Sequence, residues 1–287
     1  MPNECTIHSV LGTRHSALKL MPKISPHALV DPAARLADDV EVGPFCIIGP
    51  NVTLGAGTRL HNNVTITGIT TIGRNNEIFP NAVLGAPPQD RKATGGQTRV
   101  EIGDNNIFRE AVTVHAGTEL GGGITRLGDN NMLLVNAHVG HDALVGNNCT
   151  LINNAMLGGH VVLGNNVTLG GCAGIFQRVT LGEFCFITAY SRITHDAPPF
   201  MKIDGPNVVR GVNVVGLRRG GFANADIDAI DDAARRLFYY RTKPFAQALA
   251  EFDTMNGINP HVKKLVEFMR KRDEGKGGRY LESRRGH

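Results

Sequence analysis

The sequence predicts a parallel β-helix followed by a small α-helical domain. Two observations carry this prediction: an aliphatic residue recurs at every sixth position along most of the chain, and the spacing becomes helical after about residue 210. The composition agrees, because 35 of the 287 residues are glycine and only 6% are aromatic. Such a composition favours regular turns over an ordinary globular core.

The six-residue period defines the coiled part. Stepping by six from Ile24 to Leu84 meets an aliphatic residue every time, and so does stepping from Leu127 to Ile193. Units of this kind fold as short strands joined by turns, with successive coils about 4.8 Å apart. A small or β-branched residue follows four positions later in most units, so three of the cysteines are predicted to be interior fillers: Cys46, Cys149 and Cys185.

Two loops interrupt the period. Residues 85–99 contain paired prolines, paired glycines and several charges, and residues 116–125 contain three consecutive glycines. Both compositions are typical of loops. Loops that leave a rigid scaffold often carry function, so we expect these two segments to lie near the site.

The last part of the chain is predicted to be helical. Asn224 is expected to cap a helix over residues 225–241, and Pro244 and Pro260 to open two more helices. The expected organisation is a flexible N-terminal extension over residues 1–20, a β-helix over 21–210 and a helical domain over 211–287.

Charge and residue usage exclude several classes of protein. The formal charge of +4 does not indicate nucleic-acid binding, and the five cysteines have no metal-ligand spacing. No apolar run approaches the roughly eighteen residues of a membrane span. The N-terminus lacks the apolar core of a secretory signal, so a cytoplasmic location is expected.

A cluster of histidines stands out from the turns of the repeat. His138 and His141 flank the inward-facing Val139, Asp142 follows, and His160 lies one coil further along near the same corner. An imidazole oriented by a carboxylate is suited to act as a general base. Backbone N–H groups of the neighbouring glycine-rich turn around Gly159 are suited to bind an oxyanion. Acyl transfer fits this combination, and zinc ligation by three histidines is the competing use.

Several motifs then identify a family. The chain resembles the UDP-N-acetylglucosamine O-acyltransferases of lipid A biosynthesis in VGPFCIIGP (42–50), QDRK (89–92), FREAVTVHAGT (108–118), NAHVGHD (136–142), NNAMLGGHV (153–161) and GVNVVGLRRGGF (211–222). The resemblance implies a left-handed β-helix and a homotrimer with active sites between subunits. It also implies transfer of a (3-hydroxy)acyl chain from acyl carrier protein to the 3-hydroxyl of the UDP-sugar. No metal and no cofactor are implied beyond the phosphopantetheine that carries the acyl group.

The resemblance also implies roles for individual residues. His141 matches the general base, Asp142 its orienting partner and Gly159 the backbone donor to the oxyanion. The implied substrate-binding residues are Asp90, Lys92, His138, His160, Gln177 and Arg219.

The chain departs from the family pattern at Phe176, where the family has a histidine before the glutamine. This departure keeps the first two of three alternatives open, and the clustered histidines raise the third. The acceptor could be a UDP 3-amino sugar or another divergent sugar, the chain could be a catalytically silent paralogue, or it could be a zinc enzyme of the γ-carbonic anhydrase type.

Overall fold

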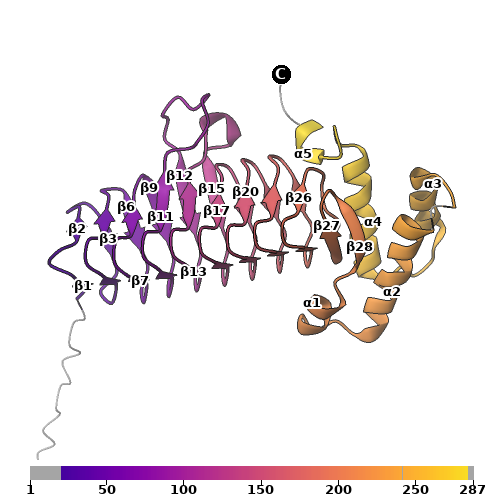
Figure 1. The fold of residues 1–287 in the computed structure, drawn as a ribbon, viewed down its shortest axis with the longest axis horizontal. Helices are drawn as coiled ribbons and strands as arrows, with labels where there is room; N and C mark the ends of the chain where they lie inside the picture. The colour runs from indigo at the N-terminus through magenta and orange to yellow at the C-terminus, as the bar shows by residue number, and fades with distance from the viewer. Residues whose placement is uncertain (1–20, 241, 284–287) are drawn as a thin grey trace, which may run out of the picture.

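The fold is a left-handed parallel β-helix that ends in a small group of helices (Figure 1), and it confirms the predicted fold class. The computed structural model describes residues 21–240 and 242–283. The expected N-terminal extension, residues 1–20, lies outside the described residues. Among the described residues, no helix has both the length and the apolar character to cross a membrane.

Three sheets form the sides of the coil, and their strands pair in parallel with the strand one coil away, except that the last strand, β28 (Val208–Val212), pairs antiparallel with β27 (Met201–Asp204). The first sheet contains β1 (Lys23–Ile24), β4 (Glu41–Val42), β7 (Arg59–Leu60), β10 (Glu77–Ile78), β13 (Ile107–Phe108), β16 (Met132–Leu133), β19 (Thr150–Leu151), β22 (Thr168–Leu169), β25 (Phe186–Ile187), β27 (Met201–Asp204) and β28 (Val208–Val212). The second contains β2 (Leu29–Val30), β5 (Ile47–Ile48), β8 (Thr65–Ile66), β11 (Val83–Ala86), β14 (Thr113–His115), β17 (His138–Val139), β20 (Met156–Leu157), β23 (Gly174–Ile175) and β26 (Arg192–Ile193). The third contains β3 (Arg35–Leu36), β6 (Val52–Leu54), β9 (Ile69–Ile72), β12 (Arg99–Ile102), β15 (Ile124–Leu127), β18 (Leu144–Val145), β21 (Val162–Leu163) and β24 (Thr180–Leu181).

The six-residue period sets both the interior and the corners of the coil. Aliphatic residues such as Val139, Leu157 and Ile175 stack in register and are almost completely buried. One residue at nearly every corner has positive φ, which asparagine tolerates better than most residues. At one corner this position is filled by Asp142 (φ 60°) and, one coil on, His160 (φ 61°).

Three cysteines of the coil are interior fillers, as predicted. Cys46, Cys149 and Cys185 are at most 1% exposed. Burial raises the pKa of the Cys149 thiol to about 11. These thiols are therefore not placed for nucleophilic chemistry.

Both predicted loops leave the coil on the same side (Figure 1). One connects β11 to β12, and the other connects β14 to β15 through the 3₁₀-helix η1 (Glu119–Gly121). They contact each other, because the Gly96 amide donates to the Glu119 carboxylate.

The helical part differs in detail from the expectation. Its elements are α1 (Val214–Arg219), α2 (Asn224–Ala234), the π-helical turn η2 (Arg235–Tyr239), α3 (Phe245–Ala250), the 3₁₀-helix η3 (Glu251–Thr254), α4 (Pro260–Asp273) and α5 (Tyr280–Ser283). Asn224 is the first helical residue of α2 and not its cap; Ala223 takes that position without a side-chain hydrogen bond. Pro260 opens α4 as predicted, with Asn259 as the cap.

Candidate active site

The corner after β17 presents His141 and Asp142 outside the core. Val139 and Ala143 on either side are fully buried, which fixes the turn between them. The left-handed conformation of Asp142 makes the corner tight, and its amide N–H donates to the Thr125 hydroxyl at 2.8 Å. The repeat thus holds the backbone of both functional residues rigidly.

Asp142 orients His141. Nδ1 of His141 lies 2.8 Å from Oδ2 of Asp142, and the two side chains are 15% and 1% exposed. The loop after β14 holds the carboxylate, because Thr118 donates from its amide (2.8 Å) and its hydroxyl (2.7 Å). Burial acts to raise the pKa of Asp142, but the hydrogen bonds from His141 and Thr118 outweigh it and keep the pKa below its ordinary value. Since a carboxylate only accepts, Nδ1 carries the proton and Nε2 of His141 is free to act as a base.

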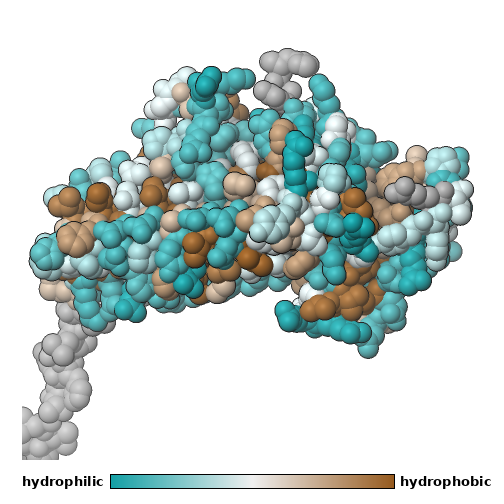
Figure 2. Space-filling view, viewed as in Figure 1, coloured by the Kyte–Doolittle hydropathy of each residue, from teal (hydrophilic) through white to brown (hydrophobic). Residues whose placement is uncertain are grey.

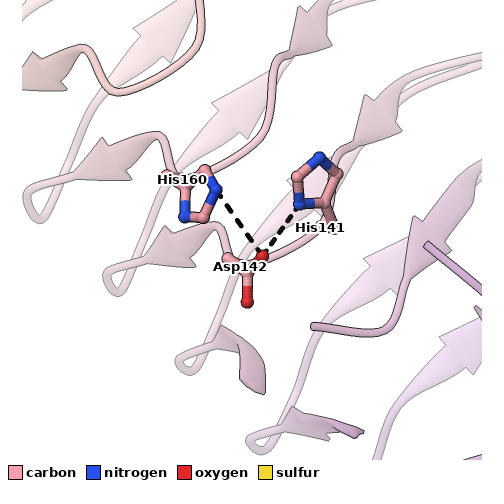
Figure 3. Close-up of side chains that lie close together, drawn as sticks. All are labelled: His141, Asp142 and His160. Carbon is pink, nitrogen blue, oxygen red and sulfur yellow. Dashed lines mark hydrogen bonds and ion pairs between the residues drawn. The ribbon is translucent and has the colours of Figure 1, made fainter. Parts of the chain in front are cut away.

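His160 stacks one coil beyond Asp142 (Figure 3). Its Nε2 lies 3.8 Å from Oδ2 of Asp142 and 3.2 Å from Nη2 of Arg178, and its ring meets the His141 ring edge-on at 5.2 Å. Burial, followed by the charge of Arg178, lowers the pKa of His160. His160 is therefore neutral at neutral pH and accepts a hydrogen bond from Arg178.

Gly159 lies directly against the His141 ring. A Cβ built on Gly159 would come within 2.5 Å of Cε1 and Nε2 of His141, so only glycine fits beneath this ring. Within the described part of the chain, the amide N–H of Gly159 donates to no protein acceptor.

Such free turn amides recur at this corner, because among the described residues the amides of His141 and Gln177, one coil before and one coil after, also have no protein acceptor. At a different corner, after four strands of the third sheet, the turn amide is instead capped by a side chain one coil on. These amide–oxygen pairs are Arg74–Asp104, Asp104–Asp129, Asp129–Asn147 and Asn147–Asn165, at 2.6–2.8 Å. Among the described residues no side chain caps the amide of Gly159 in this way, so this amide is a donor that can bind an oxyanion.

A groove of about 510 Å³ runs past this corner. His138 lies in its wall, with Nδ1 2.8 Å from the Thr113 hydroxyl, and burial is the main cause that lowers the pKa of His138. The residues lining the groove are Gln89, His115, His138, Gly140, His141, Met156, Leu157, Gly158, Gly159, Gly174, Ile175, Phe176, Gln177 and Arg192.

Sequence reasoning missed His115 and Thr118. His115 is 8% exposed, and its Nδ1 donates to the Pro87 carbonyl at 2.7 Å at the base of the first loop. Its ring lies 5.3 Å from that of His138. One feature of the sequence could have pointed to His115: it does not fall on the aliphatic period in FREAVTVHAGT, at the point where the chain leaves the coil.

The structure brings most of the predicted residues together. His138, His141, Gly159 and Gln177 line the groove, and Asp142 and His160 lie behind it. Asp90, on the first loop, is close enough to favour the protonated form of His160. Lys92 is exposed on that loop and Arg219 is exposed at the end of α1, and neither lines the groove of its own chain.

Within residues 21–240 and 242–283, the donor set that most resembles a metal site lies at this same corner. One ligand atom each from His141, Asp142 and His160 lies within 4.8 Å of the others. Oδ2 of Asp142, however, already accepts from the Thr118 hydroxyl and from His141. The carboxylate is therefore already engaged in hydrogen bonds. The set contains two imidazoles, whereas the zinc alternative requires three.

The β-helix with a histidine–carboxylate pair at a groove defines a hexapeptide-repeat acyltransferase. The family models that match are the bacterial transferase hexapeptide (six repeats) over residues 22–68 and domain 2 of Udp N-acetylglucosamine O-acyltransferase over residues 196–277.

The relatives narrow this class to one family. The acyl-[acyl-carrier-protein]–UDP-N-acetylglucosamine O-acyltransferase of Saccharophagus degradans is 42% identical over 88% of this chain and 98% of its own length. The protein of the same name from Azorhizobium caulinodans is 44% identical over 84% and 92%. The crystal structure of UDP-N-acetylglucosamine O-acyltransferase from Moraxella catarrhalis superposes with a TM-score of 0.82 at 36% identity, covering 86% of this chain and 96% of that one. The chain belongs to the UDP-N-acetylglucosamine O-acyltransferase family.

Proposed function

We propose that this chain transfers a (3-hydroxy)acyl group from acyl carrier protein to the 3-hydroxyl of UDP-N-acetylglucosamine, the first step of lipid A biosynthesis. The observation that carries the proposal is the His141–Asp142 pair next to the free amide of Gly159. A base and an oxyanion donor side by side are what acyl transfer to a hydroxyl requires.

The reaction follows from these positions. Nε2 of His141 takes the proton from the sugar hydroxyl as its oxygen attacks the thioester carbonyl, and the Gly159 amide stabilises the resulting oxyanion. Asp142 stabilises the imidazolium through Nδ1. The tetrahedral intermediate then collapses to the ester, the C–S bond breaks, and His141 returns its proton to the phosphopantetheine thiolate. The acyl group passes directly between substrates, without a covalent enzyme intermediate.

The other predicted residues serve substrate binding in this proposal. His138, His160 and Gln177 contact the substrates along the groove, and Asp90 and Lys92 approach from the loop that overhangs it. No metal and no further cofactor take part. The net charge of +4 favours encounter with an acidic carrier protein in the cytoplasm.

We also propose that the protein is a homotrimer. Apolar side chains are exposed on the coil: Met156, which lines the groove, is 50% exposed, and Leu144 is 40% exposed. In Figure 2, brown areas mark the coil and the region near α1 and α2. Exposed apolar areas of this kind are typical of subunit interfaces. In a trimer, Arg219 would reach a neighbour's groove and not its own.

The test is transfer by the purified protein with acyl carrier protein thioesters. UDP-N-acetylglucosamine and its 3-amino analogue are compared as acceptors, and the hydroxyl sugar is expected to be the better substrate. His141→Ala is expected to lower kcat by about 10²–10⁴-fold, the usual contribution of a general base. His27→Ala, an exposed histidine at the other end of the coil, is the control and should leave kcat unchanged. Full activity in His141→Ala would refute the mechanism, and faster amine acylation would refute the acceptor.

A further inference from the structure

The C-terminal segment Lys276–Ser283, which includes α5, returns from the helices to the coil (Figure 1). Asp196 of the coil binds this segment through two hydrogen bonds. Its amide donates to the Gly278 carbonyl at 2.7 Å, and its Oδ2 accepts from the Tyr280 amide at 2.8 Å. The other carboxylate oxygen accepts from the Thr180 amide of the coil at 2.7 Å. Asp196 is 3% exposed, so this attachment is part of the core.

The segment follows the corner that carries the active site. Asp142, His160, Arg178 and Asp196 occupy the same corner on successive coils, eighteen residues apart. Tyr280 lies at the level of Asp196, and the Glu282 carboxylate lies 3.7 Å from Nε of Arg178. Arg178 in turn donates to His160. The segment therefore ends one coil from His160, on the same side of the coil as the two loops (Figure 1).

Arg279 connects this segment to the groove. Its guanidinium carbon lies 5.0 Å from the centre of the Phe176 ring, within the range of a cation–π contact. The Arg279 side chain is only 16% exposed, and Nη1 lies 3.4 Å from the Thr194 carbonyl. Phe176 is 40% exposed and lines the groove. Arg279 thus packs against one face of the Phe176 ring.

Phe176 ends a run of two glycines at its position in the stack, and His115 stands at the other end of that run. The two preceding coils have Gly140 and Gly158 there, which leave the groove floor without side chains. An apolar ring at the end of such a floor suits the acyl donor, because the acyl chain is the apolar part of the two substrates. A nucleotide diphosphate requires polar partners at its binding site.

We propose that residues 279–283 form a wall of the active site, and that Arg279 is a positioning residue that holds the Phe176 ring across the donor end of the groove. The inference rests on the proposed acyl transfer. Without Arg279, the ring loses the contact on one face and the donor end of the groove loosens, whereas the base and the oxyanion donor stay in place.

The experiment compares the wild-type protein with Arg279→Ala, Arg279→Lys, Phe176→Ala and the Arg279→Ala/Phe176→Ala double variant. KM is measured separately for acyl carrier protein thioester and for UDP-sugar, together with the midpoint of thermal unfolding. Lys276→Ala, exposed in the same segment, is the matched control.

Arg279→Ala is expected to raise the donor KM about three- to tenfold, in line with the strength of a cation–π contact, and to leave the acceptor KM unchanged. Arg279→Lys keeps a cation over the ring and should restore most of the donor affinity. The double variant should match Phe176→Ala alone, because Arg279 acts through the ring. Lys276→Ala should behave like the wild type.

An unchanged donor KM in Arg279→Ala would overturn the inference, and so would additive effects in the double variant. A lower unfolding midpoint with both KM values unchanged would also overturn it, because that result indicates a purely structural role. Absence of transfer by the wild type would instead refute the proposed function. In that case, the affinities of Arg279→Ala and of the wild type for acyl carrier protein thioester would still be compared by calorimetry. Equal affinities would overturn the positioning role.

Discussion

Gly159 is important in the proposed site because it has no side chain. The absence of a Cβ lets the His141 ring lie against the turn, and it also leaves the backbone amide beside that ring uncovered. The φ of Gly159 is not in the left-handed region, so the backbone itself would accept another residue. Contact with His141 is therefore the reason for glycine here, and substitution tests the site without straining the coil.

Gly159→Ala is expected to reduce kcat strongly, by about 10²-fold, with little change in thermal stability. The added methyl group displaces the base from its position next to the oxyanion donor, and misplacements of about 1 Å cost about this much. The measurements are steady-state kinetics and the unfolding midpoint. Gly171→Ala is the matched control: it holds the same place in its own repeat unit, and its added Cβ would meet ordinary contacts at 3.5 and 3.7 Å. Comparable activity in the two variants would contradict the role given to Gly159.

At the scale of the strands and turns, buried asparagines hold the coil together where the loops interrupt it. Asn76, Asn106 and Asn131 occupy successive interior positions and are at most 1% exposed. The amide of Asn106 donates to Oδ1 of Asn76 at 2.9 Å, and the amide of Asn131 donates to Oδ1 of Asn106 at 2.8 Å. Side-chain oxygens thus satisfy backbone donors that would otherwise be buried without partners.

Asn106→Leu is expected to destabilise the protein by about 2–4 kcal/mol. The change leaves the buried Asn131 amide without its acceptor, which costs about 1–3 kcal/mol, and it removes one of the two hydrogen bonds to Oδ1 of Asn76, which is worth about 1 kcal/mol. The unfolding midpoint, measured at fixed protein concentration, should fall by several degrees. Asn62→Leu, at an exposed turn, is the control and should change it little. Equal midpoints for the two variants would show that the asparagine ladder does not stabilise the coil.

Much of this architecture was predictable from the six-residue period. The period depends on local packing, so it indicated the coil, both loops and the outward place of His138, His141 and Asp142. It also indicated that His160 would meet them one coil later.

Contacts between distant segments were not predictable in this way. Nothing local to Thr118 shows that its hydroxyl reaches Asp142, and nothing local to Arg279 shows that it lies over Phe176. Each of these contacts depends on where a loop or a terminal segment folds back onto the coil. The capping role expected of Asn224 was wrong because the chain enters α2 from α1 with Ala223 at the cap position.

For the whole molecule, the position of Arg219 indicates how the sites are assembled. α1 lies at the end of the coil, on the side opposite the loops and α5 (Figure 1), and Arg219 does not line its own groove. In the proposed homotrimer, each groove would combine His141 of one subunit with Arg219 of the next. The light-scattering mass should then be three times the 30.8 kDa of one chain.

Subunit mixing tests this arrangement. His141→Ala homotrimers should be almost inactive, and Arg219→Ala homotrimers should lose about tenfold or more in kcat/KM, because the charged contact that we propose between Arg219 and the nucleotide would be removed. When the two variants are co-expressed, every mixed trimer contains one groove that joins an intact His141 to an intact Arg219. Each mixed trimer, isolated by means of two different affinity tags, should therefore have about a third of the wild-type activity.

The result would differ if His141 and Arg219 served the same groove from one chain. The His141→Ala subunits would then contribute nothing, and the Arg219→Ala subunits would only keep their own low activity. A mixed sample no more active than the average of its parents would thus contradict the shared groove.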